Sequence, residues 1–232
     1  MINHKILLAL TLALSIFSGC KKDSDVDNSN SNNPTPASGT LTDIDGNTYE
    51  TVTIHGKVWM KENLKVTHYR NGDPITNITD SATWCNTSSE GWCHYNNDPS
   101  ISAVYGKLYN WWAVMDSRKI APAGWHVATS AEYDSLIAYF GGTDVAGKEL
   151  KELGTTHWIN PNNATNSSGF KALPNGIRYG TILQFKSLTL VSYFWTDAGS
   201  INIYCYMPNY NDKAHVSPYA RHGGLGVRCV KD

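Results

Sequence analysis

The sequence predicts one α+β domain built on a mostly antiparallel sheet. Three observations predict it: short runs rich in Thr, Val, Ile and Tyr at residues 41–60, helical spacing at residues 129–153, and further strand patterns at residues 177–230. Strands, then helices, then strands are typical of domains in which helices pack on an antiparallel sheet. Residues 40–232 are enough for one domain with a sizeable core.

Residues 41–60 are predicted to form three short strands joined by two tight turns. The turns fall at Asp45-Gly46-Asn47 and His55-Gly56-Lys57, where glycine permits the positive φ that hairpins require. From Asn71 to Ser100 the sequence is polar and resembles a long loop. The later strands are expected around residues 177–179, 192–196, 201–207 and 225–230.

Two short helices are predicted between these groups of strands. Thr129 and Glu132 have the spacing of a capping box, and apolar residues follow at helical spacing until Gly141-Gly142 ends the helix. A second helix is expected over residues 144–153, opening after Thr143 and closing at Gly154.

The N-terminus has the layout of an export signal. A short basic lead precedes an apolar run at residues 6–17, which is shorter than the about 20 residues that a transmembrane helix requires. Ser18-Gly19-Cys20 then resembles the lipobox of bacterial lipoproteins, although Phe17 stands where that motif usually has Leu. Residues 1–19 are therefore predicted to be a signal peptide, with Cys20 as the lipidation site. The alternative is an ordinary secretory signal and a soluble product.

Residues 20–39 are predicted to be a disordered linker that tethers the domain to a membrane. The segment is rich in Asn, Ser, Asp and Pro and has almost no apolar side chains to bury. The Lys and Asp residues after Cys20 resemble signals that send lipoproteins to the surface of the outer membrane. We therefore expect a cell-envelope protein, lipid-anchored in the outer membrane and exposed at the cell surface.

Composition predicts a binding surface rather than a nucleic-acid interface. The formal net charge is only −1, and 8 Trp and 13 Tyr stand against 5 Phe. Trp and Tyr combine an apolar ring with a polar edge, as sites for glycans or protein partners require. The Asn and Asp residues beside these rings allow two interpretations. They form a calcium site, with calcium as the cofactor, or their side chains simply bond to the local backbone of a turn. The candidate ligand-binding residues are Trp84, Trp92, Tyr95, Asn96, Asn97, Asp98 and Trp112.

Four further cysteines follow Cys20, namely Cys85, Cys93, Cys205 and Cys229. Export places them in an oxidising compartment, so two disulfides are expected, and four cysteines allow three pairings. Local closure favours Cys85–Cys93 and Cys205–Cys229. Zinc is disfavoured because neither pair has the spacing of a structural zinc site.

Motifs along residues 41–232 resemble the Fibrobacter succinogenes major paralogous domain, a family found mostly in exported proteins and lipoproteins. They are Asp43-Ile44-Asp45-Gly46-Asn47-Thr48-Tyr49, Trp59-Met60-Lys61-Glu62-Asn63-Leu64, Tyr105-Gly106-Lys107-Leu108-Tyr109-Asn110-Trp111, Gly124-Trp125-His126-Val127, Asn166-Ser167-Ser168-Gly169-Phe170, Ala172-Leu173-Pro174-Asn175-Gly176 and Val227-Arg228-Cys229-Val230-Lys231-Asp232. The resemblance assigns residues 40–232 to this domain. It also implies a C-type-lectin-like fold, shared with formylglycine-generating enzymes.

Two departures from the family and its fold relatives affect the expected chemistry. Family members commonly carry a cysteine just before the motif at residues 122–126, which is absent here, so the resemblance implies that Cys229 pairs with Cys205 instead. The Glu-Pro-Asn and Gln-Pro-Asp triplets of calcium-dependent lectins are also absent. A lectin-like scaffold therefore does not by itself imply lectin chemistry.

The sequence favours a non-enzymatic binding or adhesion module over two alternatives. No Gly-x-Ser-x-Gly or His-Glu-x-x-His motif accompanies the histidines, so no catalytic residue is assigned. One alternative is an enzyme related to formylglycine-generating proteins, which would use Cys205 and Cys229. The other is a structural or assembly component of the envelope.

Overall fold

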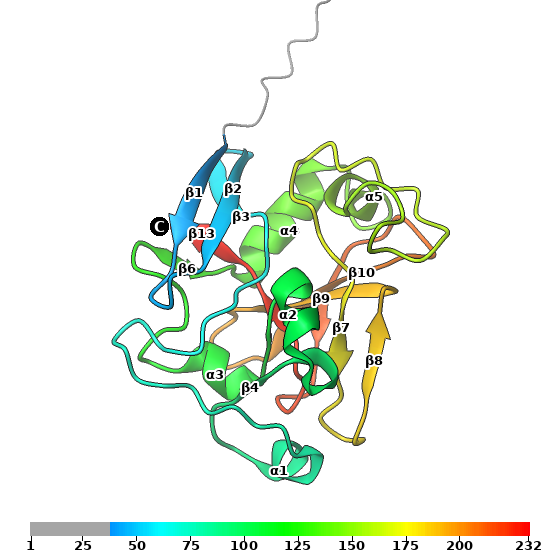
Figure 1. Ribbon diagram of the computed structural model, residues 1–232. Helices are drawn as coiled ribbons and strands as arrows, with labels where there is room; N and C mark the ends of the chain where they lie inside the picture. Colours follow the sequence, from blue (N-terminus) through cyan, green and yellow to red (C-terminus); the bar gives the residue numbers. More distant parts are fainter. Residues whose placement is uncertain (1–37) are drawn as a thin grey trace, which may run out of the picture. The chain divides into compact units, whose positions relative to one another are not determined.

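The first and last strands of the described chain lie in one five-stranded sheet. The computed structural model describes residues 38–232. The sheet has the order β1-β2-β3-β13-β6, and every neighbouring pair is antiparallel. Figure 1 shows β13 beside the N-terminal hairpin strands. The strands are β1 (Ser38–Thr42), β2 (Thr48–Ile54), β3 (Lys57–Met60), β6 (Trp125–Val127) and β13 (Cys229–Lys231).

The three strands predicted for residues 41–60 are confirmed, and both turns contain glycine with positive φ, at Gly46 and Gly56. The folded part begins slightly earlier than predicted, because Ser38 already pairs with Val52 in the sheet. The predicted signal peptide, the predicted lipidation site Cys20 and the predicted linker up to residue 37 lie outside the described residues.

A second sheet of four strands has the order β11-β10-β9-β12. Its pairs are antiparallel except β12 with β9, so the predicted α+β fold with a mostly antiparallel sheet is confirmed. Two two-stranded sheets, β4-β5 and β7-β8, complete the strand set. These strands are β4 (Trp92–Cys93), β5 (Leu108–Tyr109), β7 (Asn175–Arg178), β8 (Phe185–Leu188), β9 (Val191–Thr196), β10 (Ile203–Pro208), β11 (His215–Pro218) and β12 (Gly226–Val227).

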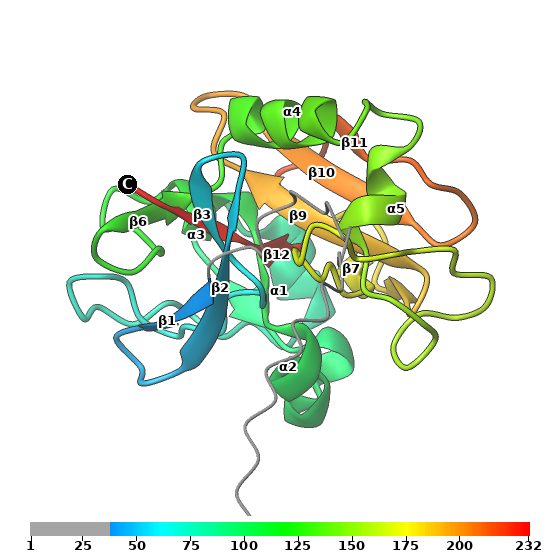
Figure 2. The same cartoon turned by 90° about the horizontal axis from the view of Figure 1, so that it is seen from above.

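Both predicted helices are present. Helix α4 (Ser130–Tyr139) has the expected capping box between Thr129 and Glu132, and α5 (Ala146–Leu150) is shorter than predicted. Figure 2 shows α4 lying across the four-stranded sheet, where it contacts β10 and β11. The capping box and the apolar spacing after it therefore identify the helix that covers this sheet.

The prediction of only two helices was wrong, because the described residues contain three more α-helices. These are α1 (Ser81–Asn86), α2 (Pro99–Tyr105) and α3 (Trp111–Met115), and a 3₁₀ turn, η1 (Tyr95–Asn97), lies between α1 and α2. The predicted loop at residues 71–100 thus contains ordered elements. Each helix is too short for apolar periodicity to reveal it, but an N-cap side chain begins each one, at Asp80, Asp98 and Asn110.

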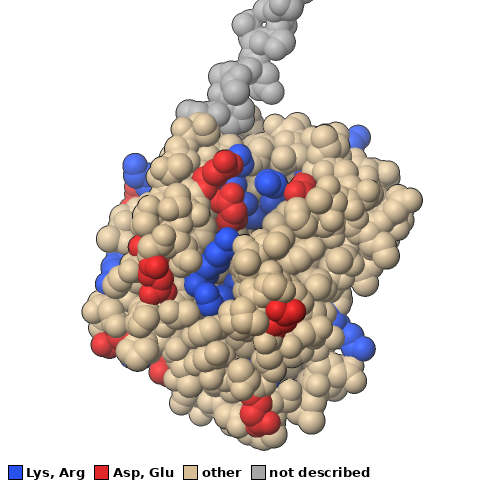
Figure 3. Space-filling view, in the orientation of Figure 1, with Lys and Arg blue, Asp and Glu red and all other residues tan. Residues whose placement is uncertain are grey.

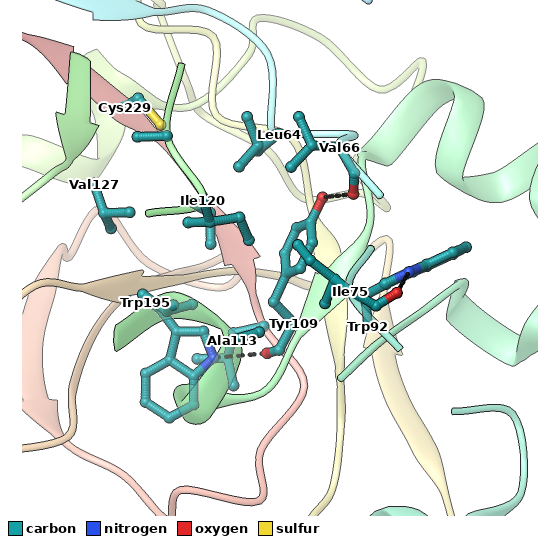
Figure 4. Packing of buried hydrophobic residues seen from close by; sticks show 14 of the residues in the cluster. Leu64, Val66, Ile75, Trp92, Tyr109, Ala113, Ile120, Val127, Trp195 and Cys229 are labelled. Atoms are coloured by element: carbon teal, nitrogen blue, oxygen red, sulfur yellow. Dashed lines mark hydrogen bonds between the residues drawn. The ribbon is translucent and has the colours of Figure 1, made fainter. Parts of the chain in front are cut away.

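The five-stranded sheet has a hydrophobic cluster on each face. Neighbouring residues on a strand point to opposite faces, so Met60 and Cys229 join one cluster while Trp59 and Val230 join the other. Figure 4 shows the first cluster, in which Tyr109 donates its hydroxyl to the carbonyl of Val66. The strand alternation thus decides which side chains form each half of the core.

Two buried arginines tie loops to this core through backbone carbonyls. Arg228 donates to the carbonyls of Met60, Phe170 and Lys171, and to Oδ1 of Asn63. Arg178 donates to the carbonyls of Ile78 and Thr79. Both guanidiniums also lie over aromatic rings, which favours burial of their long side chains. These charges serve the scaffold, since their donors are occupied by the main chain.

The two predicted disulfides, Cys85–Cys93 and Cys205–Cys229, are absent: all four cysteines are free thiols. Cys205 and Cys229 belong to different hydrophobic clusters. Cys93 belongs to the same hydrophobic cluster as Trp84, whereas Cys85, the next residue of α1, lies outside that cluster. Consecutive helical residues point about 100° apart, so Trp84 and Cys85 cannot both face Cys93. Closeness in sequence was therefore a poor guide to pairing.

The surface of the described domain carries mixed charge. On the face drawn in Figure 3, basic side chains form a short stripe bordered by acidic ones. No helix within residues 38–232 has the length and apolar character needed to cross a membrane.

Candidate functional site

Three of the aromatic residues predicted to bind a ligand are core residues instead. Trp84, Trp92 and Tyr95 are 0%, 7% and 7% exposed. The indole of Trp84 donates to the carbonyl of His222, and that of Trp92 donates to the carbonyl of Ile75, as Figure 4 shows for Trp92. The three rings are buried in the core, and both indole N–H groups already donate to backbone carbonyls. The prediction that these side chains form a ligand surface was therefore wrong.

The polar residues beside them perform turn chemistry. Asn96 and Asn97 adopt positive φ, and the side-chain amide of Asn97 donates to the carbonyl of Thr79. Asp98 accepts from the backbone N–H and hydroxyl of Ser100, and so caps α2. Within residues 38–232, no three His, Cys, Asp or Glu side chains gather as metal ligands would.

Trp112, unlike the three aromatic core residues, lines a surface cavity. The cavity has a volume of about 360 Å³ and lies between the start of α3 and the segment before β4. We call it the Trp111–Trp112 groove. Its lining residues are Ser88, Ser89, Glu90, Trp111, Trp112, Met115 and Asp116.

Asn110 joins the two walls of this groove. Its Oδ1 accepts from the backbone N–H groups of Gly91 and Ala113, and its Nδ2 donates to the carbonyl of Ser89. The side chain is 1% exposed, and it also caps α3. A Cβ at Gly91 would lie 2.6 Å from Cδ1 of Ile78 and 3.3 Å from Nδ2 of Asn110, so the Ile78 side chain would have to shift. A buried amide and a glycine therefore hold residues 88–91 against α3, which neither segment's own sequence reveals.

Two half-buried indoles form the apolar part of the groove. The rings of Trp111 and Trp112 are 6.4 Å apart and nearly perpendicular. Trp112 contacts the ring of His222 at 4.7 Å, and the guanidinium of Arg221 lies 4.3 Å from the ring of Trp111. The indole N–H of Trp111 has no hydrogen-bond partner within the described residues. The two rings are thus braced on one side by a histidine and an arginine.

Two carboxylates, those of Glu90 and Asp116, provide the polar part of the groove, and Arg118 lies behind them. Arg118 binds Asp116 through two nitrogens, at 2.9 and 2.7 Å, and lies 3.7 Å from Glu90. The hydrogen bonds from Arg118 lower the pKa of Asp116, so this carboxylate stays ionised at neutral pH. All three side chains are partly exposed. Since the carboxylate oxygens of Glu90 and Asp116 are only partly engaged by Arg118, they can accept further hydrogen bonds from a ligand.

A second cavity, of about 220 Å³, lies beside His126. Nδ1 of His126 is 2.7 Å from Asp232, and Nε2 is 3.0 Å from Glu132. Both ring nitrogens therefore have carboxylate partners, and neither is free to accept a proton from a substrate. His126 therefore joins β6 to Glu132 of α4 and to Asp232, the residue that follows β13.

Sequence reasoning identified Trp112 but missed Glu90, Asp116 and Arg118. Asp116 and Arg118 lie within a few residues of Trp112, and that proximity was the one available signal. Glu90 is brought to the groove by Asn110 and has no signal in the local sequence.

The comparison with family models supports the resemblance stated from the motifs. The model described as the Fibrobacter succinogenes major domain matches residues 52–231. Comparison with curated proteins and with solved structures gives no match, so the C-type-lectin-like description stays a prediction. The family match covers most of the chain and nearly all of the folded domain. The chain therefore belongs to the Fibrobacter succinogenes major domain family.

Proposed function

We propose that this protein is an envelope lipoprotein whose domain binds an uncharged glycan, without catalysis, in the Trp111–Trp112 groove. The observation that carries the proposal is the pairing of two half-buried indoles with an ion-paired carboxylate on one groove wall. Concave sites with aromatic walls and a few placed polar groups are the usual form of small-ligand sites.

The chemistry of the groove suits a sugar better than a flat apolar ligand. A sugar ring has apolar C–H faces, which pack on an indole, and a rim of hydroxyls that both donate and accept hydrogen bonds. Glu90 and Asp116 accept from such hydroxyls, while the hydroxyls of Ser88 and Ser89 donate to them. Because Asp116 is already paired with Arg118, the groove does not demand a charged ligand.

The location of the domain at the cell envelope rests on the N-terminal sequence. A basic lead, a short apolar run and Cys20 after two small residues are typical of an exported lipoprotein. We expect Cys20→Ala to move the protein from the membrane fraction to the soluble fraction. Membrane association that survives this substitution would contradict lipid anchoring.

Neither alternative function is favoured by a specific observation. Burial raises the pKa of the Cys205 and Cys229 thiols, which are also in separate clusters. Reactive thiols need the opposite, a lowered pKa and exposure. A purely structural role in envelope assembly predicts self-association, which sedimentation at several protein concentrations would reveal.

Binding of purified protein to a panel of neutral polysaccharides tests the proposal. Trp112→Ala is expected to weaken the measured affinity at least about tenfold, since aromatic anchors are typical binding hot spots. Tyr139→Ala is the matched control, because Tyr139 is an exposed aromatic on α4 that does not line the groove. Equal affinity of wild type and Trp112→Ala for every bound polysaccharide would refute the groove as the site.

A further inference from the structure

Aromatic contacts continue from the Trp111–Trp112 groove onto the four-stranded sheet. Arg221 lies on Trp111, and the backbone N–H of Trp111 donates to the carbonyl of Arg221. Two residues earlier in the same segment, the ring of Tyr219 lies 5.0 Å from that of Tyr204 on β10. The segment at residues 219–222 therefore borders the groove at one end and the sheet at the other.

Asn202 fixes the middle of that segment. Its side-chain amide donates to the carbonyl of Tyr219, and its own carbonyl accepts from the backbone N–H of Tyr219. The side-chain oxygen of Asn202 also lies 3.4 Å from Nε of Arg221. Tyr219 and Arg221 are thus held in place relative to one another.

Tyrosines on one face of the sheet form a stack that we call the tyrosine ladder: Tyr193, Tyr204, Tyr206 and Tyr219. Rings of Tyr204 and Tyr206 are 5.3 Å apart and nearly parallel, and Tyr193 stacks on both across the strand pair. Side chains alternate along β10, so Cys205 points into the core while its two neighbours point to the opposite face. The ladder is a consequence of this alternation.

The ladder and the groove pack against one hydrophobic cluster. Tyr193, Tyr204, Tyr219 and Trp111 are all partly buried side chains packed against the same hydrophobic cluster. Tyr206 extends the row as far as His215 on β11, whose ring lies 5.0 Å away. Contacts therefore continue without a break from Trp112 to the edge strand of the sheet.

The chemistry of the ladder selects an uncharged, hydroxyl-rich partner. None of its four residues carries a formal charge, and burial raises the pKa of Tyr204 to about 12, so its phenol stays protonated at neutral pH. Stacked phenols offer ring edges for apolar contact, and hydroxyls that donate and accept. Of the basic side chains near the ladder, Arg221 lies on Trp111, and Lys213 lies close to Tyr206 but is paired with Asp144.

We propose that the tyrosine ladder is a second subsite for the same ligand, and that the ligand is therefore a linear neutral glycan spanning from groove to ladder. This inference rests on the proposed function of the groove. Two linked subsites raise the affinity for a chain long enough to occupy both, because binding at the second subsite becomes intramolecular.

Oligosaccharides of increasing length, prepared from whichever neutral polysaccharide binds, test the inference by calorimetry. Wild type is expected to bind long chains at least about tenfold more tightly than short ones. Tyr206→Ala is expected to remove that gain and to leave the affinity for short chains unchanged. Tyr139→Ala is the matched control, since Tyr139 is a 53% exposed tyrosine on α4 that lies outside both the groove and the ladder.

The outcomes separate the two proposals. If Trp112→Ala binds both short and long chains as wild type does, the groove proposal fails and the ladder inference fails with it. If Trp112→Ala weakens binding but Tyr206→Ala keeps the full gain with length, the ladder inference alone fails. Circular dichroism of each variant confirms that it is folded, and tighter binding of a polyanionic polysaccharide than of any neutral one would also overturn the inference.

Discussion

Arginines in the interior and arginines near the groove place the same guanidinium group against different kinds of partner. Arg228 and Arg178 are 0% and 1% exposed and donate mainly to backbone carbonyls. Arg118 and Arg221 are partly or fully exposed and contact carboxylates or the ring of Trp111. Interior donors are occupied by backbone carbonyls, whereas the two outer arginines are held mainly by side chains at the surface.

A similar contrast separates most residues of the family motifs from the proposed binding residues, although Trp111 belongs to both. Asn63, Asn110, Asn175 and Arg228 all belong to the motifs that carry the resemblance, and all are nearly fully buried. Asn175 holds β9 through two hydrogen bonds with Tyr193, much as Asn110 holds the groove walls. Most motif residues therefore build the scaffold, whereas Trp112 and Tyr206 of the proposed binding surface lie outside the motifs.

The largest expected effect comes from removing an interior guanidinium. Arg228→Met leaves three backbone carbonyls and Oδ1 of Asn63 without their donor, which should lower the free energy of unfolding by about 3–5 kcal/mol. Arg221→Met is the matched control and should change it by less than about 0.5 kcal/mol. Urea unfolding measures both. Equal losses in the two variants would remove the distinction between the regions.

The tryptophans should divide in the same way. Trp84→Ala removes a fully buried side chain and its hydrogen bond to His222, at an expected cost of about 3–5 kcal/mol. Trp112→Ala should cost about 1 kcal/mol, because the side chain is already partly exposed. Thermal unfolding followed by circular dichroism compares them, and a Trp112→Ala variant that fails to fold would place Trp112 in the core.

A pH titration of stability sharpens the account of His126. Burial lowers the pKa of His126, but the hydrogen bonds to Asp232 and Glu132 outweigh it and raise the pKa above 6.5. Burial likewise raises the pKa of Glu132, while hydrogen bonds from Thr129, Lys57 and His126 lower it to about 2. The contribution of His126 to the stability of the fold is therefore complete below pH 6.5, and it is lost as the pH rises through the pKa of His126 in the folded state. The contribution of the Glu132 carboxylate to the stability of the fold is lost as the pH falls from 4.5 towards about 2.

Melting temperatures measured across this range should thus show a maximum at weakly acidic pH. His126→Gln should lose the decline on the alkaline side and keep the decline on the acidic side. The contribution assigned to His126 would be wrong if the variant and wild type declined in parallel as the pH rises above 6.5.

The smallest expected effect concerns the thiols. Burial raises the pKa of Cys93 to about 11 and raises those of Cys205 and Cys229 as well, so all three should react slowly in the native state. Cys85 is half-buried and should react first. In Cys20→Ala, denaturation without reductant should expose four thiols, the four free cysteines of the structure. Finding none would restore the two disulfides that the sequence predicts.

Much of the fold was predictable because its signals are local. The hairpins at residues 41–60 follow from glycine turns, and α4 follows from its capping box. The short helices α1 and α3 escaped because five or six residues cannot show a period of 3.6. The buried state of Trp84 and Trp92 escaped because it depends on partners far along the chain, such as the carbonyl of His222.

Indole N–H signals in a proton–nitrogen NMR spectrum test the central claim most directly. The chain has eight tryptophans, so each region of the molecule has its own reporters. During titration with a neutral polysaccharide that binds, the signals of Trp111 and Trp112 should shift, while those of the buried Trp59, Trp84, Trp158 and Trp195 stay in place. Saturable binding that leaves both groove signals unmoved would contradict the account.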